Sequence, residues 1–170
     1  LAFEHARSRA LPQGTGPNLI QNAGFEEGVT PWKDNKGLLT MVRNLAHSGS
    51  AAGLISQRTA PYAGPIQQLS PQVLDNTHRF VCSAWVRIEQ YAPQPVQITL
   101  RYDDEQGTHY LSAAHGRAKR GEWSQVSGAF EIKPSGKVRF MDLFLEGPAP
   151  GVDFLVDDLL SKPENKVMKP

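Results

Sequence analysis

The residues best suited to chemistry lie between Val138 and Leu160, a stretch that reads VRFMDLFLEGPAPGVDFLVDDLL. Its first half alternates with a period of two, which is typical of a β-strand. One face carries Arg139, Met141, Leu143 and Leu145, and the other carries Phe140, Asp142, Phe144 and Glu146. The first face is the expected core face. Two aromatic rings beside two carboxylates suit a solvated groove that holds a flat, hydroxylated ligand.

The second half of the stretch, FLVDDLL, places two adjacent carboxylates on a second expected strand. Side chains of neighbouring residues point to opposite faces of a strand, so either Asp157 or Asp158 must point inward. A buried carboxylate needs a partner because an unpaired charge is costly in the interior. A metal ion is one candidate for that partner.

Catalysis is a rival interpretation of the same acids. A glycosidase needs two carboxylates about 5 to 9 Å apart across a cleft, and Asp142 and Glu146 share a strand face. A small jelly-roll glycosidase or polysaccharide lyase is therefore one alternative. The five histidines do not strengthen it, because the sequence lacks the GxSxG elbow of a serine hydrolase. A glycan-silent structural or adhesin domain is the other alternative.

Composition narrows the class of protein. The 170 residues predict one domain that is large enough to bury a core. The 18 basic and 17 acidic residues are interspersed, which argues against a nucleic-acid surface, and no window is apolar enough to span a bilayer. The single Cys82 lies in an apolar run, so it is expected to pack as a buried thiol without a disulfide.

Short alternating runs separated by Gly and Pro predict an all-β fold. The chain has 15 Gly and 13 Pro, above the usual combined share of roughly 12%. Expected strands or hairpin arms fall within residues 18–28, 37–44, 46–58, 78–88, 95–103, 108–114 and 121–132, with two more in the stretch described above. Residues 67–76 hold at most one helical turn. Nine or ten such strands predict an antiparallel β-sandwich.

Several short motifs resemble the carbohydrate-binding modules of families 4, 9 and 22, and family 22 most of all. In order, the motifs are NLIQNAGFEEG, a Trp, AHSGSAAGL, an Arg-containing loop ending in GP, FVCSAWV, GEW and FLVDDL. The resemblance implies a jelly roll of the galactose-binding-domain-like type that covers residues 18–162. Residues 1–17 are then a linker or N-terminal arm, and residues 163–170 are a C-terminal linker. Such a module binds xylan, or mixed-linkage β-glucan, on a concave sheet.

The resemblance also implies binding residues. Tyr62 and Tyr110 match the positions that stack on sugar rings, and Glu146, with Phe144 two residues before it, matches the cleft acid. A basic residue after Trp32 is matched by Lys33 or Lys36. Gln97, Thr99 and Arg101 share the polar face of one expected strand and would line the cleft floor if that strand belongs to the concave sheet. The ordinary alternatives are that Tyr62 only packs and that Glu146 is an exposed strand-end acid.

The family further implies a structural calcium ion. Its ligands here would be Glu26, Ser50 through its carbonyl, and Asp157. The alternative is that backbone N–H groups or an Arg hold these acids. The module is expected to be non-catalytic and monomeric, and to be secreted as part of a longer polypeptide with a glycoside hydrolase domain. Neither nucleic acid nor a membrane is an expected partner.

Overall fold

The computed structural model describes residues 13–165 and is almost entirely β-structure. The strands are β1 (Leu38–Arg43), β2 (Ala51–Ser56), β3 (Ile66–Leu69), β4 (Arg79–Arg87), β5 (Gln94–Asp104), β6 (Gly107–Ala118), β7 (Ser124–Glu131), β8 (Phe140–Glu146) and β9 (Phe154–Pro163). All ladders between strands are antiparallel. One short 3₁₀ helix, η1 (Pro71–Leu74), follows β3 at the expected place.

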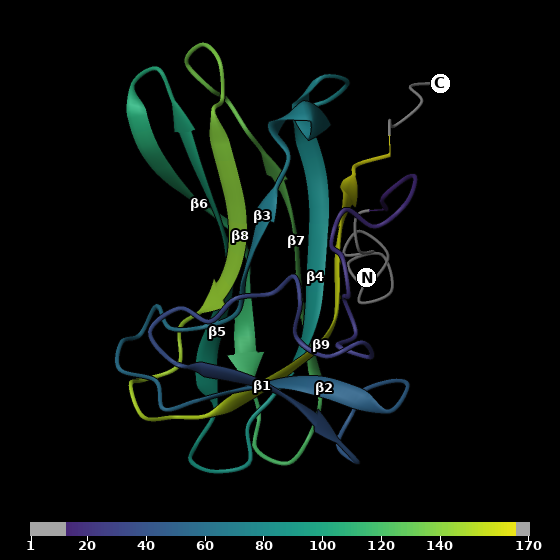
Figure 1. Cartoon of the computed structure of the whole chain (residues 1–170), viewed down its shortest axis with the longest axis vertical. Coiled ribbons are helices and arrows are strands. Elements are labelled where there is room, and N and C mark those ends of the chain that lie inside the picture. Colours follow the sequence, from purple (N-terminus) through teal and green to yellow (C-terminus); the bar gives the residue numbers. More distant parts are fainter. Residues whose placement is uncertain (1–12, 166–170) are drawn as a thin grey trace, which may run out of the picture.

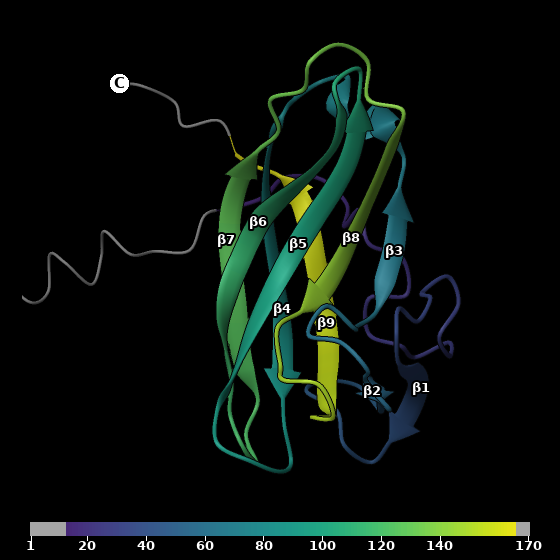
Figure 2. The ribbon, with the colours of Figure 1, turned by 90° about the vertical axis from the view of Figure 1, so that its left-hand side faces the viewer.

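The strands form two facing sheets, which confirms the predicted sandwich. The five-stranded sheet has the order β1-β2-β9-β4-β7, and the four-stranded sheet has the order β3-β8-β5-β6. Figure 1 shows the two sheets from the side. Figure 2 shows the four-stranded sheet in front of β4 and β9. Strands of one sheet follow strands of the other along the chain, so the chain crosses between the two sheets several times.

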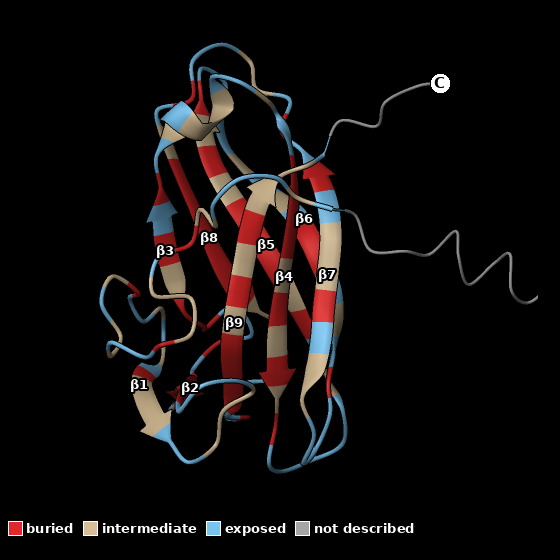
Figure 3. Cartoon of the chain, turned by 90° about the vertical axis from the view of Figure 1, so that its right-hand side faces the viewer, coloured by how far each residue is buried: buried red, intermediate tan, exposed pale blue. Residues whose placement is uncertain are grey.

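The strands alternate between buried and more exposed side chains, and the buried ones face the core between the two sheets. On β4 the side chains of Phe80, Cys82, Ala84 and Val86 are buried in the core, as predicted. Figure 3 shows buried residues in red alternating with partly buried ones along β4. On β8 the buried row is Met141, Leu143 and Leu145. Arg139 was expected on this face, but it precedes β8 and is exposed.

The segment from residue 18 to residue 28 is irregular, so the strand expected there is wrong. No strand is present from residue 18 to residue 28, and Asn22 and Phe25 have φ angles of 46° and 58°, outside the β region. Phe25 instead inserts into the core and stacks on Trp32, with 5.5 Å between ring centroids. Its ring fills the space over Gly53, where an added Cβ would lie 2.7 Å away. Gly53 of AHSGSAAGL therefore makes room for this ring.

The two ends of the described chain lie together. The amide of Thr15 donates to the carbonyl of Pro163, and the amide of Asn165 donates to the carbonyl of Gln13. Cys82 is a free, buried thiol, and burial raises its pKa to about 12. Within residues 13–165, no helix is long and apolar enough to cross a bilayer.

Candidate binding cleft

A cleft lies on the open face of the four-stranded sheet. Its volume is about 620 Å³, within the range of ligand sites of about 300–1,000 Å³. It is lined by Asn35, Tyr62, Ile66, Gln97, Thr99, Arg101, Tyr110, Leu111, Ser112, Phe144 and Glu146. Four of the six side chains expected to bind ligand therefore meet in one place: Tyr62, Tyr110, Phe144 and Glu146. The expected floor residues on β5 lie there as well.

Strand register explains why these residues meet. Across β8 and β5, Asp142 pairs with Arg101, Phe144 with Thr99, and Glu146 with Gln97. On the far side of β5, Tyr110 pairs with Arg101 and Ser112 pairs with Thr99. Directly opposite residues share a face of the sheet. The alternation of β8 therefore builds rows of polar and aromatic side chains across three strands.

An ion pair fixes the middle of the floor. The Arg101 guanidinium donates from Nε to Asp142 Oδ1 at 3.0 Å and makes a second contact to Oδ2. The Asp142 side chain is only 3% exposed, and burial raises its pKa although Arg101 opposes this shift. The carboxylate in turn raises the pKa of Arg101. Because the fork geometry is bidentate, the Arg101 side chain is held rigidly.

The loop that carries Tyr62 is tied to the fold from beneath. Arg58 is 3% exposed, and its guanidinium donates to the carbonyl oxygens of Ala60, Pro61, Ala63, Ala149 and Val152. Burial lowers the pKa of Arg58, and the group lies over the Phe154 ring at 5.1 Å. Gly64 lets the loop approach β8, because a Cβ there would overlap the Leu145 carbonyl oxygen. The Arg and the GP pair therefore position the loop.

The exposed rings of the cleft come from different elements. Tyr62 is 49% exposed on the loop before β3, and Tyr110 is 66% exposed on β6. Phe144 is buried and lines the floor of the same cleft. Sequence reasoning missed the lining roles of Asn35 and Ser112. The only sequence signal for Asn35 was its place in WKDNKG, next to the expected lysines. In the structure its side-chain amide Nδ2 donates to the Tyr62 carbonyl at 3.4 Å.

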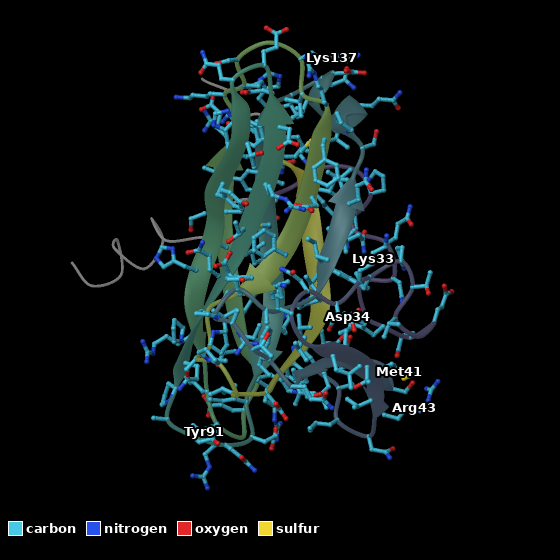
Figure 4. The ribbon with its side chains drawn as sticks, turned by 60° about the vertical axis from the view of Figure 1, so that its left-hand side comes forward. Lys33, Asp34, Met41, Arg43, Tyr91 and Lys137 are labelled. Carbon is cyan, nitrogen blue, oxygen red and sulfur yellow. The ribbon has the colours of Figure 1, made fainter. Side chains whose placement is uncertain are left out.

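The two lysines expected near the cleft lie in different surroundings. Lys33 bridges to Ile66 by backbone hydrogen bonds and lines a neighbouring hollow of about 570 Å³. Figure 4 shows it on the loop beside β3. Lys36 has a φ angle of 55° and lines neither hollow. Its backbone carbonyl accepts from Thr59, so its role in the loop is through the main chain.

The cleft continues at both ends. The hollow at Lys33 shares Ile66 and Arg101 with it, and a third hollow of about 340 Å³ shares Gln97 and Glu146. Together the three form a groove along the open face of the sheet. A groove open at both ends can hold a chain that extends beyond it.

The geometry of the acids does not support a glycosidase. Asp142 and Glu146 are four residues apart on β8, which is about 13 Å at the rise of a strand. This exceeds the separation of about 5 to 9.5 Å that the two carboxylates of a glycosidase require. Asp142 is also neutralised by Arg101. What the site offers instead is aromatic rings for the C–H faces of sugars and planar polar groups for their hydroxyls.

The expected calcium ligands lie on the opposite layer of the sandwich. Asp157 has no exposed surface, and it accepts backbone N–H bonds from His47, Ser48 and Asp158. Glu26 Oε1 accepts from the Ser50 amide at 2.5 Å. These contacts match the backbone-held alternative. The two aspartates and Glu26 all lie beside Gly24. A Cβ atom added to Gly24 would be 3.5 Å from Asp157 Oδ1 and 3.6 Å from Asp158 Oδ1.

These residues fit a calcium ion only with help from the main chain. Among residues 13–165, no three His, Cys, Asp or Glu side chains form a metal-holding group. Calcium also accepts backbone carbonyl oxygens, so the carbonyl of Ser50 would have to complete the set of ligands. Burial, and after it the neighbouring charge of Asp158, raise the pKa of Asp157 to about 6. Calcium binding by Glu26, Ser50 and Asp157 stays a prediction.

Comparison with known proteins identifies the family of this chain. Residues 17–151 match the CBM_4_9 family, described as a carbohydrate binding domain. Endo-1,4-beta-xylanase A of Thermotoga maritima is 27% identical over 87% of this chain, and endo-1,4-beta-xylanase 2 of Arabidopsis thaliana is 25% identical over 96%. This chain spans only 14% and 16% of the length of those two proteins.

Solved structures with the same fold include two family 22 modules. The C-terminal family 22 carbohydrate binding module of Clostridium thermocellum Xyn10B superposes with a TM-score of 0.77 at 19% identity, over 92% of this chain and 100% of that one. The CBM22-1 xylan-binding domain of Paenibacillus barcinonensis Xyn10C gives 0.76 at 22% identity, over 92% and 99%. The fold and the family match both confirm the resemblance found in the sequence. The chain belongs to the CBM_4_9 family of carbohydrate-binding domains, whose members bind glycans and are not catalytic.

Proposed function

We propose that the cleft on the four-stranded sheet binds xylan. The observation that carries the proposal is the meeting of Tyr62, Tyr110 and Glu146 in one open cleft with the amide of Gln97. Tyrosine rings suit the C–H faces of pyranose units, and carboxylate and amide groups accept or donate to their hydroxyls. Relatives named endo-1,4-beta-xylanase, and structural neighbours named xylan-binding domains, support this choice of glycan.

The shape of the groove supports binding within a chain instead of at its end. The neighbouring hollows extend the cleft beyond Arg101 on one side and beyond Gln97 on the other. A linear polysaccharide can then lie along the sheet with its ends free. Lys33 would contact the chain at the first of these hollows.

In its biological setting the domain targets an attached glycoside hydrolase to its substrate. The relatives are much longer than this chain, and each matches it over 12–16% of its own length. A solved relative joins a CBM22-1 module to a GH10 module in one chain. The polysaccharide is extracellular, so the proposal includes secretion. The domain acts as a monomer, and a calcium ion at Glu26, Ser50 and Asp157 stabilises it.

Mixed-linkage β-glucan is the second candidate ligand. One relative, 23% identical over 98% of this chain, is named exoglucanase XynX from Acetivibrio thermocellus. An equatorially linked glucan chain offers the same flat faces to Tyr62 and Tyr110. The two glycans differ in the hydroxymethyl group of glucose and in the β-1,3 linkages of the glucan. The relatives named endo-1,4-beta-xylanase favour xylan.

Affinity gel electrophoresis tests the proposal directly. The chain is run through gels that contain xylan, mixed-linkage β-glucan, laminarin or galactan, and the same samples are assayed for released reducing sugar. Retardation by xylan without release is the expected result. Retardation by β-glucan alone would reassign the ligand, and no retardation in any gel would leave a glycan-silent domain. Released reducing ends would overturn the binding-only function.

A further inference from the structure

A second groove lies on the outer face of the five-stranded sheet, on the layer opposite the cleft. Its volume is about 360 Å³. Its floor follows the strand register, in which Leu54 of β2 pairs with Leu155 of β9, and Leu155 pairs with Arg87 of β4. Val42 and Leu45 add partly exposed apolar surface from β1 and the loop after it. The groove shares no lining residue with the cleft.

An exposed aromatic ring stands at the rim of this groove. Tyr91 lies in the loop between β4 and β5 and is 56% exposed. Its φ angle is 75°, in a region that residues other than Gly and Asn rarely adopt. Figure 4 shows Tyr91 and Arg43 at the same end of the molecule, away from Lys33. An exposed tyrosine held at the mouth of a groove resembles the arrangement at Tyr62.

The charged groups of the groove balance each other. Arg87 Nε donates to Glu89 Oε1 at 2.5 Å, and the Arg87 side chain is only 20% exposed, so this pair is held in place. Arg43 and Asp153 add one further charge of each sign. A site with no net charge, a flat ring and planar hydrogen-bonding groups suits an uncharged, hydroxylated ligand. A protein partner would need about 800 Å² of contact on each side, far more than so small a groove presents.

From these features we infer that the groove at Tyr91 is a second carbohydrate site, which takes one or two units of a neutral glycan. The choice of xylan as its probe rests on the proposed function. The groove and the cleft lie on opposite layers, so one domain would hold two separate stretches of polysaccharide. Two weak sites on one domain raise the overall affinity for a polymer without any new contact at either site.

Amide NMR titration with xylohexaose separates the two sites, because each reports through its own residues. The expected result is two groups of shifting amides, one around Gln97 and Glu146 and one around Arg87 and Tyr91. Tyr91→Ala should abolish the second group and keep the first. The double variant Tyr62→Ala, Glu146→Ala should do the reverse. Calorimetry should count two sites in the parent chain and one in each variant.

Each other outcome has a defined meaning. Shifts in the cleft alone, with none around Tyr91 at saturating xylohexaose, would overturn the second site and leave the proposed function intact. Shifts around Tyr91 alone would support the second site and refute the cleft assignment. If the amide signals around Tyr91 shift when the protein concentration is raised in the absence of sugar, the groove is a contact between two copies of the chain. This result would also overturn the inference. Loss of both groups in Tyr91→Ala would overturn it as well.

Discussion

The guanidinium of Arg58 holds the backbone on both sides of Tyr62, through the carbonyl oxygens of Pro61 and Ala63. The exposed ring of Tyr62 therefore depends on a buried cation that never reaches the cleft. Lysine cannot replace this group, because an ammonium offers three donors from one point and lacks the planar fork. Arg58 is thus a positioning residue for the expected sugar platform.

Arg58→Lys should weaken both binding and stability. Each buried carbonyl left without a donor costs about 1–3 kcal/mol. A loss of about 1 kcal/mol lowers Tm by about 2–4 °C in a domain of this size. We expect a Tm lower by several degrees and a weaker affinity for xylan, measured by calorimetry and affinity gels. An unchanged affinity would show that the loop holds Tyr62 without Arg58.

Tyr62→Ala and Glu146→Ala should each weaken xylan binding by about tenfold or more, on the order of 1.4 kcal/mol. Both side chains line the cleft, and Tyr62 is half exposed, so the Tm should stay nearly unchanged. Lys36→Ala is the matched control, since Lys36 is exposed and lines neither hollow. If both cleft variants bind as tightly as the parent, the cleft is not the xylan site.

Much of this cleft could be predicted from the alternation of residues 139–146. A period of two fixes which side chains share a face, and this placed Phe144 and Glu146 together correctly. Gln97, Thr99 and Arg101 were likewise assigned to one face. Whether that face met the face of β8 depended on strand order, because β5 pairs with β8 across a long connection. Periodicity carries no information on such pairing.

Loops and irregular segments were harder to predict from the sequence than strands. Apolar residues in 18–28 suggested a strand, but Ile20 and Phe25 plug the core from an irregular chain. Tertiary packing, and not local propensity, sets that backbone. Likewise, Asn35 is the residue of WKDNKG that lines the cleft, and it directly precedes Lys36, whose φ angle is positive at 55°.

Gly64→Ala should disturb the same loop by a different route. A Cβ at residue 64 would overlap the Leu145 carbonyl oxygen, so the loop must move away from β8. We expect a lower Tm and weaker xylan binding, because Tyr62 is carried by this loop. Gly24→Ala is the control, since its nearest neighbour would be 3.5 Å away, an ordinary contact, and both variants are melted in excess chelator so that the expected calcium site beside Gly24 is empty. Equal behaviour of the two variants in thermal melts would refute the steric argument.

Asp104 should make stability depend on acid pH. The amide of Ser135, the His109 ring and the amide of Gln106 bond its carboxylate and lower its pKa. The native state therefore binds the proton less readily than the unfolded chain, whose Asp pKa is about 3.9. The stabilisation is present above that value and is lost as pH falls through the lower native pKa.

The comparison of the parent with Asp104→Asn tests this sign. The Tm difference between them should be largest near neutral pH and should shrink as pH falls below about 4. Calorimetry over this range, with xylan binding at neutral pH as a check on the fold, gives the readout. A Tm difference that stays constant across the range would show that the asparagine lowers stability through lost geometry alone.

Calcium should raise the Tm, and chelation should lower it, if Glu26, Ser50 and Asp157 hold the ion. A ligand that binds only the folded state stabilises it by about 2.7 kcal/mol at one hundred times its Kd. Asp157 is buried on the layer opposite the cleft, so calcium should leave the intrinsic affinity for xylan unchanged.

Asp157→Asn and Glu26→Gln should each abolish the response of the Tm to calcium. Magnesium is the control ion, because it demands near-ideal octahedral geometry at shorter distances than calcium. Equal melting in calcium, magnesium and chelator would mean that backbone N–H groups alone hold the two acids.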